Sequence, residues 1–179
     1  MSHRENYRPG RASGARVDKQ GDAWTLVLVR DLRHPPALVW DALTDPAQLK
    51  EWAPFDADRN LAAPGAVTLT TVGAPQPNVA KCEVVRTEKP RLLEYTWGGN
   101  DLRWELEAQG EGTRLTLWTH IPKGFIAWGA AGWHVCFDVL ERFLSREPIG
   151  RIVGAQALQF DGWQQLLAEY TAQFGLDSK

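Results

Sequence analysis

The sequence predicts an α+β domain in which a curved, six-stranded antiparallel sheet wraps around one long helix near the C-terminus. Two observations carry this prediction. Residues 66–121 contain five segments of alternating apolar and polar residues, and the short turns between them require antiparallel pairing. Residues 127–144 then carry an apolar stripe at helical spacing, and no other element is large enough to cover the apolar face of such a sheet.

The first predicted strand covers residues 24–33 and is apolar on both faces at its centre. A proline pair ends it, because proline fixes φ and lacks a backbone donor. Two short helices are expected next. Residues 38–43 have apolar side chains at helical spacing, and Asp45 followed by Pro46 is typical of a helix N-cap. The second short helix is predicted to end near Trp52.

An irregular connection is expected over residues 53–65, before the other five strands begin. These strands are predicted at residues 66–72, 79–88, 92–97, 102–108 and 113–121. After the long helix, a break is expected over residues 145–154. An extra amphipathic helix then carries its last apolar residue at Phe174, and Gly175 caps it.

The chain of 179 residues is long enough for one domain and a tail. We predict a single domain over residues 22–175, followed by a short C-terminal tail over residues 176–179. Residues 1–21 are rich in arginine and poor in large apolar side chains, so a disordered basic tail is expected there. The alternative for this tail is a basic arm that touches an anionic partner.

Composition excludes several classes of protein. Hydrophobic residues make up 44% and charged residues 23%, which excludes collagen-like, mucin-like and wholly disordered chains. The net charge of −2 gives no reason to expect a nucleic-acid partner. Cys82 and Cys136 cannot form a disulfide framework, which indicates a reducing compartment. With neither a signal peptide nor a membrane-spanning run, a cytoplasmic location is predicted.

Catalytic and metal-binding motifs are missing from the sequence. His34, His120 and His134 do not share a metal-binding spacing, and no HExxH or CxxC motif occurs. No GxSxG, GxGxxG or P-loop motif occurs either. We therefore expect neither a metal nor a cofactor and identify no catalytic residue. Cys136, on the apolar stripe of the long helix, is interpreted as a small apolar residue.

Nine tryptophans are the unusual feature of the composition. Aromatic rings bury large areas, so several of them are candidates to line a pocket: Trp52, Trp97, Trp104, Trp118, Trp128 and Trp133. Strand parity and the helix stripe point six side chains at the enclosed space: Tyr95, Trp97, Trp104, Leu117, Trp133 and Phe137. Together with Trp52 they are the predicted ligand-binding residues. Plain core packing is the alternative for each, and Trp118, of opposite parity, is expected on the outer face.

Asp31, Arg30 and Arg33 near the first strand could place a charge at the cavity, and Arg30 shares its strand parity with Leu26 and Leu28. If its guanidinium points inward, it must be paired with an acid or meet an acidic ligand, because an unpaired buried charge is costly. The alternative is an ordinary solvated strand end. The sequence alone leaves both interpretations open.

A family resemblance begins at the two short helices. The segment Pro36-Ala-Leu-Val39-Trp40-Asp-Ala42-Leu43-Thr44-Asp45-Pro46, followed by Leu49 and Trp52, resembles the opening signature of the START-like, or SRPBCC, helix-grip superfamily. The branch it resembles is the one related to activators of the heat-shock-protein-90 ATPase. Weaker matches follow in the same order at residues 95–97, 112–117 and 132–140, so that the resemblance covers about residues 24–174.

The resemblance implies a helix-grip fold with an apolar cavity between the sheet and the C-terminal helix. Relatives bind lipids, sterols, phenolics or polyketide intermediates, some are cyclases, and some contact chaperones. Three functions are therefore open: binding of a small hydrophobic ligand, a cyclase- or aromatase-like enzyme, and a chaperone-activator-like interaction. A cavity lined by Tyr95 and Trp97 favours the first, and an acid or histidine inside it favours the second. A filled interior with an exposed apolar surface favours the third.

Overall fold

The computed structural model describes residues 7–73, 76, 78–97, 99–160 and 162–176. The strands are β1 (Ala15–Gln20), β2 (Ala23–Leu32), β3 (Phe55–Ala57), β4 (Gly65–Thr71), β5 (Asn78–Glu88), β6 (Leu92–Trp97), β7 (Asn100–Gln109) and β8 (Gly112–His120). The helices are α1 (Pro36–Thr44), α2 (Pro46–Trp52), the 3₁₀ turn η1 (Lys123–Phe125), α3 (Ile126–Leu144), α4 (Ala155–Leu158) and α5 (Trp163–Gln173).

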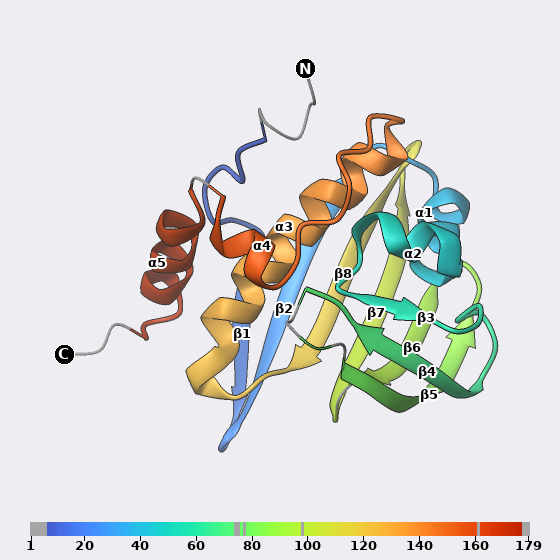
Figure 1. The fold of residues 1–179 in the computed structure, drawn as a ribbon, viewed down its shortest axis with the longest axis horizontal. Helices are drawn as coiled ribbons and strands as arrows, with labels where there is room; N and C mark the ends of the chain where they lie inside the picture. The colour runs from blue at the N-terminus through green and yellow to red at the C-terminus, as the bar shows by residue number, and fades with distance from the viewer. Residues whose placement is uncertain (1–6, 74–75, 77, 98, 161, 177–179) are drawn as a thin grey trace.

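The strands form one antiparallel sheet in the order β1-β2-β8-β7-β6-β5-β4-β3. The sheet curves around α3, which lies across its inner face, as Figure 1 shows. Helices α1 and α2 stand at one end of this layer, and α4 and α5 stand at the other (Figure 1). The α+β class, the large antiparallel sheet and the long C-terminal helix are thus as the sequence predicts. None of the helices within the described residues is both long and apolar enough to cross a bilayer.

The sheet has eight strands, so the prediction of six is wrong. The first additional strand, β1, lies in the segment expected to be a disordered tail, and it pairs with β2 along its whole length. Its side chains are mostly exposed, so apolar alternation cannot reveal it. What orders it is the row of backbone hydrogen-bonding groups that the edge of β2 offers to any neighbouring extended segment. The expectation of disorder is therefore wrong for residues 7–20, which contain the buried Tyr7 and Ala12 as well as β1, while residues 1–6 lie outside the described residues.

The second additional strand, β3, lies in the segment expected to be an irregular connection. It has three residues and pairs with β4, opposite Leu69 to Thr71. A strand of this length shows no measurable alternation, so the sequence pattern cannot predict it. Phe55 within it is fully buried and lies against the rings of Tyr95 and Trp97, with ring centroids 6.0 and 4.9 Å away. Side-chain burial thus fixes this short strand at the sheet edge.

The two short helices form as predicted. The Asp45 side chain accepts a hydrogen bond from the Ala47 backbone N–H at 2.9 Å, which caps α2. The Trp52 indole, at the other end of α2, donates to the Ala42 carbonyl oxygen at 2.9 Å and is fully buried. This bond ties α2 to α1. The long helix, Ile126–Leu144, begins and ends within one residue of its predicted limits.

Candidate functional site

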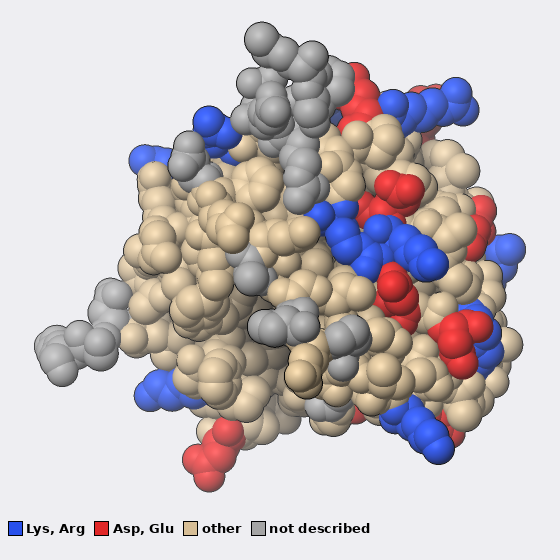
Figure 2. All heavy atoms as spheres, in the orientation of Figure 1, with Lys and Arg blue, Asp and Glu red and all other residues tan. Residues whose placement is uncertain are grey.

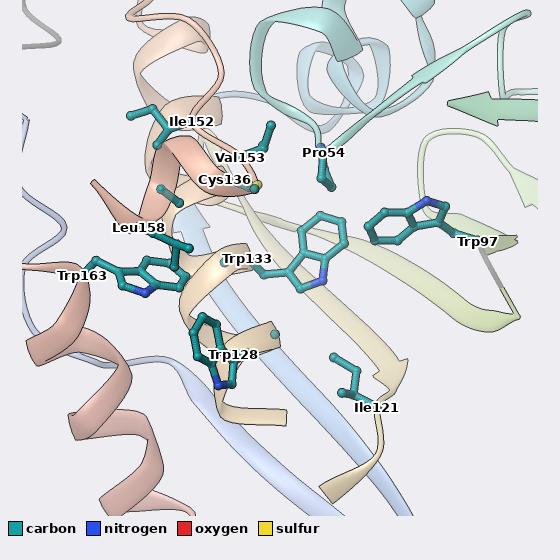
Figure 3. A pocket seen from close by; sticks show the side chains of 14 residues that line it. Pro54, Trp97, Ile121, Trp128, Trp133, Cys136, Ile152, Val153, Leu158 and Trp163 are labelled. Atoms are coloured by element: carbon teal, nitrogen blue, oxygen red, sulfur yellow. The ribbon is translucent and has the colours of Figure 1, made fainter. Parts of the chain in front are cut away.

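A cavity of about 410 Å³ lies beside α3, at the end of the sheet where α4 and α5 pack. Figure 3 shows the indole rings of Trp97 and Trp133 on one side of it and those of Trp128 and Trp163 on the other. Trp97 and Trp133 meet edge to face with ring centroids 6.0 Å apart, and the Trp128 and Trp163 centroids are also 6.0 Å apart. Pro54, from the loop after α2, closes a further side.

The walls of the cavity carry no formal charge. Its described lining consists of aromatic, aliphatic, proline and glycine residues together with one cysteine, and no acid, lysine, arginine or histidine is among them. Burial raises the pKa of the Cys136 thiol to about 12, so that the group stays protonated and apolar at neutral pH. The Trp97 indole N–H is already used, since it donates to Thr71 Oγ1 at 3.0 Å. The cavity therefore favours an uncharged guest.

Part of the cavity lining is exposed to solvent. Trp128 is 47% exposed and Leu158 is 45% exposed, although both are large apolar residues. Gly132 on α3 also lines the cavity, and a Cβ placed there would meet no atom within 4 Å. The helix surface at this point is hollow because glycine has no side chain to fill it.

Of the seven predicted ligand-binding residues, Trp97 and Trp133 line the cavity. The other five do not line it, and they lie in the packed core: Trp52, Tyr95, Trp104, Leu117 and Phe137. Trp104 is the centre of this core, with ring centroids 6.0 Å from Trp52, 5.5 Å from Trp133 and 5.9 Å from Phe137. Its indole donates to the Tyr95 hydroxyl at 3.1 Å. Aromatic side chains thus fill the space next to the cavity and support its Trp133 wall.

Sequence reasoning missed the part of the wall that comes from residues after α3. Ile152, Val153, Leu158 and Trp163 line the cavity, yet the sequence shows only a break and an amphipathic helix there. The apolar stripe of that helix shows which face is buried but not against which element. Trp118 does lie on the outer face, as predicted, where the Arg103 guanidinium sits 5.2 Å from its ring centroid.

A cluster of partly buried charged groups lies elsewhere along α3. Arg30 donates to Asp138 Oδ1 at 2.7 Å and lies 3.3 Å from Glu141, so that it points inward and is paired. The Tyr7 hydroxyl donates to the other Asp138 oxygen at 2.5 Å. Burial and the neighbouring Asp138 carboxylate raise the pKa of Tyr7 well above its usual range. None of these groups lines the cavity, so they offer a guest there neither acid nor base.

His134 belongs to the same polar cluster. Its Nε2 donates to the Pro9 carbonyl oxygen at 2.6 Å, and its Nδ1 lies 2.7 Å from the Tyr170 hydroxyl on α5. Burial raises the pKa of Tyr170 to about 12. This histidine is a buried structural residue that connects α3, α5 and the N-terminal segment. The described residues contain no group of three His, Cys, Asp or Glu side chains suited to a metal ion.

Comparisons with known proteins agree with this architecture. The model of the family described as activator of Hsp90 ATPase homolog 1-like protein matches residues 33–145. The solved structure of protein EF2215 from Enterococcus faecalis superposes with a TM-score of 0.71 at 15% identity, and the match covers 92% of each chain. CalU16 from Micromonospora echinospora superposes with a TM-score of 0.63 at 22% identity, over 93% of this chain and 96% of its own.

A third solved structure carries the family's short name, AHSA1. The AHSA1-like protein from Aeromonas hydrophila superposes with a TM-score of 0.54 at 16% identity, over 67% of this chain and 92% of its own. At such identities the solved structures show a shared fold and nothing more. No curated protein matches the chain in sequence.

Proposed function

The chain belongs to the family of activator of Hsp90 ATPase homolog 1-like proteins, and from this premise we propose that it binds a small, uncharged, apolar ligand in the cavity beside α3. The ligand class is one with an aromatic or otherwise flat apolar body. Trp97 and Trp133 on one side, with Trp128 and Trp163 on the other, are the proposed contacts (Figure 3).

The observation that carries this proposal is the combination of size and lining. A volume of about 410 Å³ falls within the usual range for small-molecule sites, and four indole rings contribute to walls without charge. Burying apolar ligand surface there is worth about 25 cal/mol per Å². Side chains around an unfilled apolar hollow lack van der Waals contacts on one side, and an apolar guest supplies these contacts.

Binding is favoured over catalysis by the position of the ionisable groups. Acid–base and nucleophilic catalysis need an ionisable or nucleophilic group in contact with the substrate, and the described lining offers only the protonated Cys136 thiol. The paired Arg30, Asp138 and Glu141 lie outside the cavity and already satisfy one another. A chaperone contact, the alternative that the family's name carries, stays a prediction.

The test is a ligand screen on the purified protein. We expect apolar aromatic compounds to raise the melting temperature and to change tryptophan fluorescence, because four indoles lie at the site. Native mass spectrometry with organic extraction identifies any compound that purifies with the chain. If a library of aromatic and lipid compounds yields neither a shift nor a bound species, the proposal fails.

Two substitutions at Gly132 locate the binding site. Gly132→Leu places a side chain into the hollow, and we expect ligand affinity to fall by at least about tenfold, equivalent to about 1.4 kcal/mol. Gly132→Ala is the matched control, since it adds only a methyl group. In mid-helix it is expected to stabilise the protein by about 0.5–1 kcal/mol while largely preserving affinity. Equal affinity in wild type and Gly132→Leu contradicts the assignment of this cavity.

A further inference from the structure

Large apolar side chains are exposed next to the cavity mouth. The described residues include six exposed large hydrophobics, and three of them belong to this region: Phe125, Trp128 and Leu158. Trp128 and Leu158 form the cavity rim, and Phe125, which is 67% exposed, precedes α3 by one residue. We call these three residues the mouth patch. Because monomeric proteins rarely gather exposed apolar residues without a use, the patch indicates a contact surface.

Two lysines flank the mouth patch. Lys123, two residues before Phe125, has its ammonium group 5.7 Å from the centroid of the Trp24 ring. The Lys19 ammonium lies 4.3 Å from the same ring. Of the acidic residues near Lys19 in the sequence, Asp18 lies 3.3 Å from Arg16, and Asp22 is in the β1–β2 turn. A tryptophan with lysines above it, beside exposed aromatic residues, is an arrangement suited to the boundary between apolar and anionic layers.

The neighbouring helices carry little charge. The sequences of α4 and α5, AQAL and WQQLLAEYTAQ, contain one charged residue, Glu169. Its carboxylate accepts a hydrogen bond from the Ala12 backbone N–H at 2.8 Å. Figure 2 shows a broad area without charged side chains on the side of the molecule where α4 and α5 lie, whereas acidic and basic side chains gather on the opposite side.

From these observations we propose that the mouth patch docks on the surface of a lipid bilayer that carries anionic headgroups. Phe125, Trp128 and Leu158 enter the boundary between headgroups and acyl chains, and Lys19 and Lys123 lie among the phosphates. The cavity mouth then faces the apolar layer. This proposal goes beyond ligand binding and does not depend on it, because Phe125 of the mouth patch and the two flanking lysines do not line the cavity.

The experiment is co-sedimentation of the full chain with vesicles. We expect binding to vesicles of phosphatidylcholine mixed with phosphatidylglycerol, weaker binding to pure phosphatidylcholine, and a loss of binding as salt is raised. Phe125→Asp is expected to lower the partition coefficient by at least about tenfold, since it removes the ring proposed to enter the bilayer and adds a negative charge. Asp is a favoured residue at the N-cap of α3, so this variant is expected to fold.

Lys123→Glu is expected to weaken binding to the anionic vesicles by about tenfold or more, and to change binding to neutral vesicles little. Leu38→Asp is the matched control for Phe125→Asp. Leu38 is 50% exposed on α1, at the end of the molecule away from α4 and α5. This control is expected to bind vesicles as wild type does. Neither Phe125 nor Lys123 lines the cavity, so ligand affinity in solution reports separately on the proposed function.

Three results overturn the docking proposal. The first is no binding of wild type to the anionic vesicles at low salt. The second is an equal loss of binding in Phe125→Asp and Leu38→Asp. The third combines two measurements: wild type does not bind vesicles, and light scattering shows that wild type is a dimer while Phe125→Asp is a monomer. This result would assign the mouth patch to contact with a second copy of the chain. Ligand binding that persists in any of these cases leaves the proposed function intact.

Discussion

Two glycines touch backbone to backbone at the edge of the cavity. Gly154, at the start of α4, has φ +57°, and Gly73, after β4, has φ +89°. A Cβ on Gly154 would collide with the carbonyl group of Gly73, and one on Gly73 would lie 2.7 Å from the Val153 carbonyl oxygen. This close approach holds the start of α4 against the sheet. The cavity wall at Val153 and Gly154 therefore depends on two residues that lack side chains.

Gly154→Ala is expected to lower the free energy of unfolding by about 1–3 kcal/mol, because it adds both backbone strain and a collision. The measurement is chemical denaturation, followed by ligand titration of the folded variant. Gly124→Ala is the control, since a Cβ at Gly124 meets nothing within 4 Å. Equal stability of the two variants contradicts the close contact between Gly73 and Gly154.

At the scale of elements, the N-terminal segment binds α5 to the rest of the protein. The Tyr170 hydroxyl on α5 donates to the Ser13 carbonyl oxygen at 3.1 Å and lies 2.7 Å from His134 on α3. Gln173 donates to the Ala12 carbonyl oxygen at 3.0 Å, one turn further along α5. Since α5 carries Trp163, these hydrogen bonds also position one wall of the cavity.

Tyr170→Phe tests this connection. The variant keeps the ring that stacks on Phe174, with centroids 5.7 Å apart, and removes the hydroxyl on which Ser13 and His134 converge. Removing the hydroxyl partner of the buried His134 ring is expected to cost about 1–3 kcal/mol. Hydrogen exchange is expected to quicken in α5 and in residues 7–14.

The control for Tyr170→Phe is Tyr95→Phe, which removes a different buried hydroxyl, the acceptor of the Trp104 indole. It is expected to lower global stability without selectively quickening exchange in α5. If both variants change exchange in the same segments, the hydrogen bonds of Tyr170 are not what holds α5 in place.

At the scale of the whole molecule, the interior is divided between a filled and a hollow part. The rings around Trp104 pack into the space between the sheet and the middle of α3. The hollow lies closer to the N-terminal end of α3, where Gly132 has no side chain to fill the helix surface and α4 and α5 close the hollow from outside. A molecule of this form keeps a tightly packed core and still has room for a guest near its surface.

The buried Cys136 thiol and Tyr170 hydroxyl make the stability of the whole molecule sensitive to high pH. Burial raises the pKa of both groups to about 12. The unfolded chain therefore loses these protons first, from about pH 9 for the thiol and about pH 10 for the hydroxyl. Their contribution to stability is complete below these values and is lost as the pH rises toward 12.

The slope of the free energy of unfolding against pH reports how many protons are released on unfolding. Between pH 9 and 12, Cys136→Ala is expected to reduce this number by up to one. Denaturation at a series of alkaline pH values measures it. Val139→Ala truncates the same buried helix without removing an ionisable group, so it is expected to lower stability at every pH with the slope unchanged. If Cys136→Ala shows the same slope as wild type, the conclusion that the thiol stays protonated in the folded protein is contradicted.

The sequence by itself determined the elements whose side chains alternate or repeat. The stripe of the long helix, the cap at Asp45 and the hairpin strands are local patterns, and each is present at its predicted place. Strand parity also placed Trp97 on the inner side, and the apolar stripe of the long helix placed Trp133 there. Local patterns are readable because each depends on residues only a few positions apart.

Only the tertiary structure decided where the hollow lies and which residues surround it. Tyr95, Trp104 and Phe137 point inward, as strand parity and the helix stripe predict. Whether inward rings fill a space or line one depends on the distance between elements. That distance is set by contacts far apart in the chain, such as Gly73 with Gly154. The strand β1 also depends on a tertiary contact. It was not predicted because its order comes from pairing with the edge of β2 and not from a pattern in its own side chains.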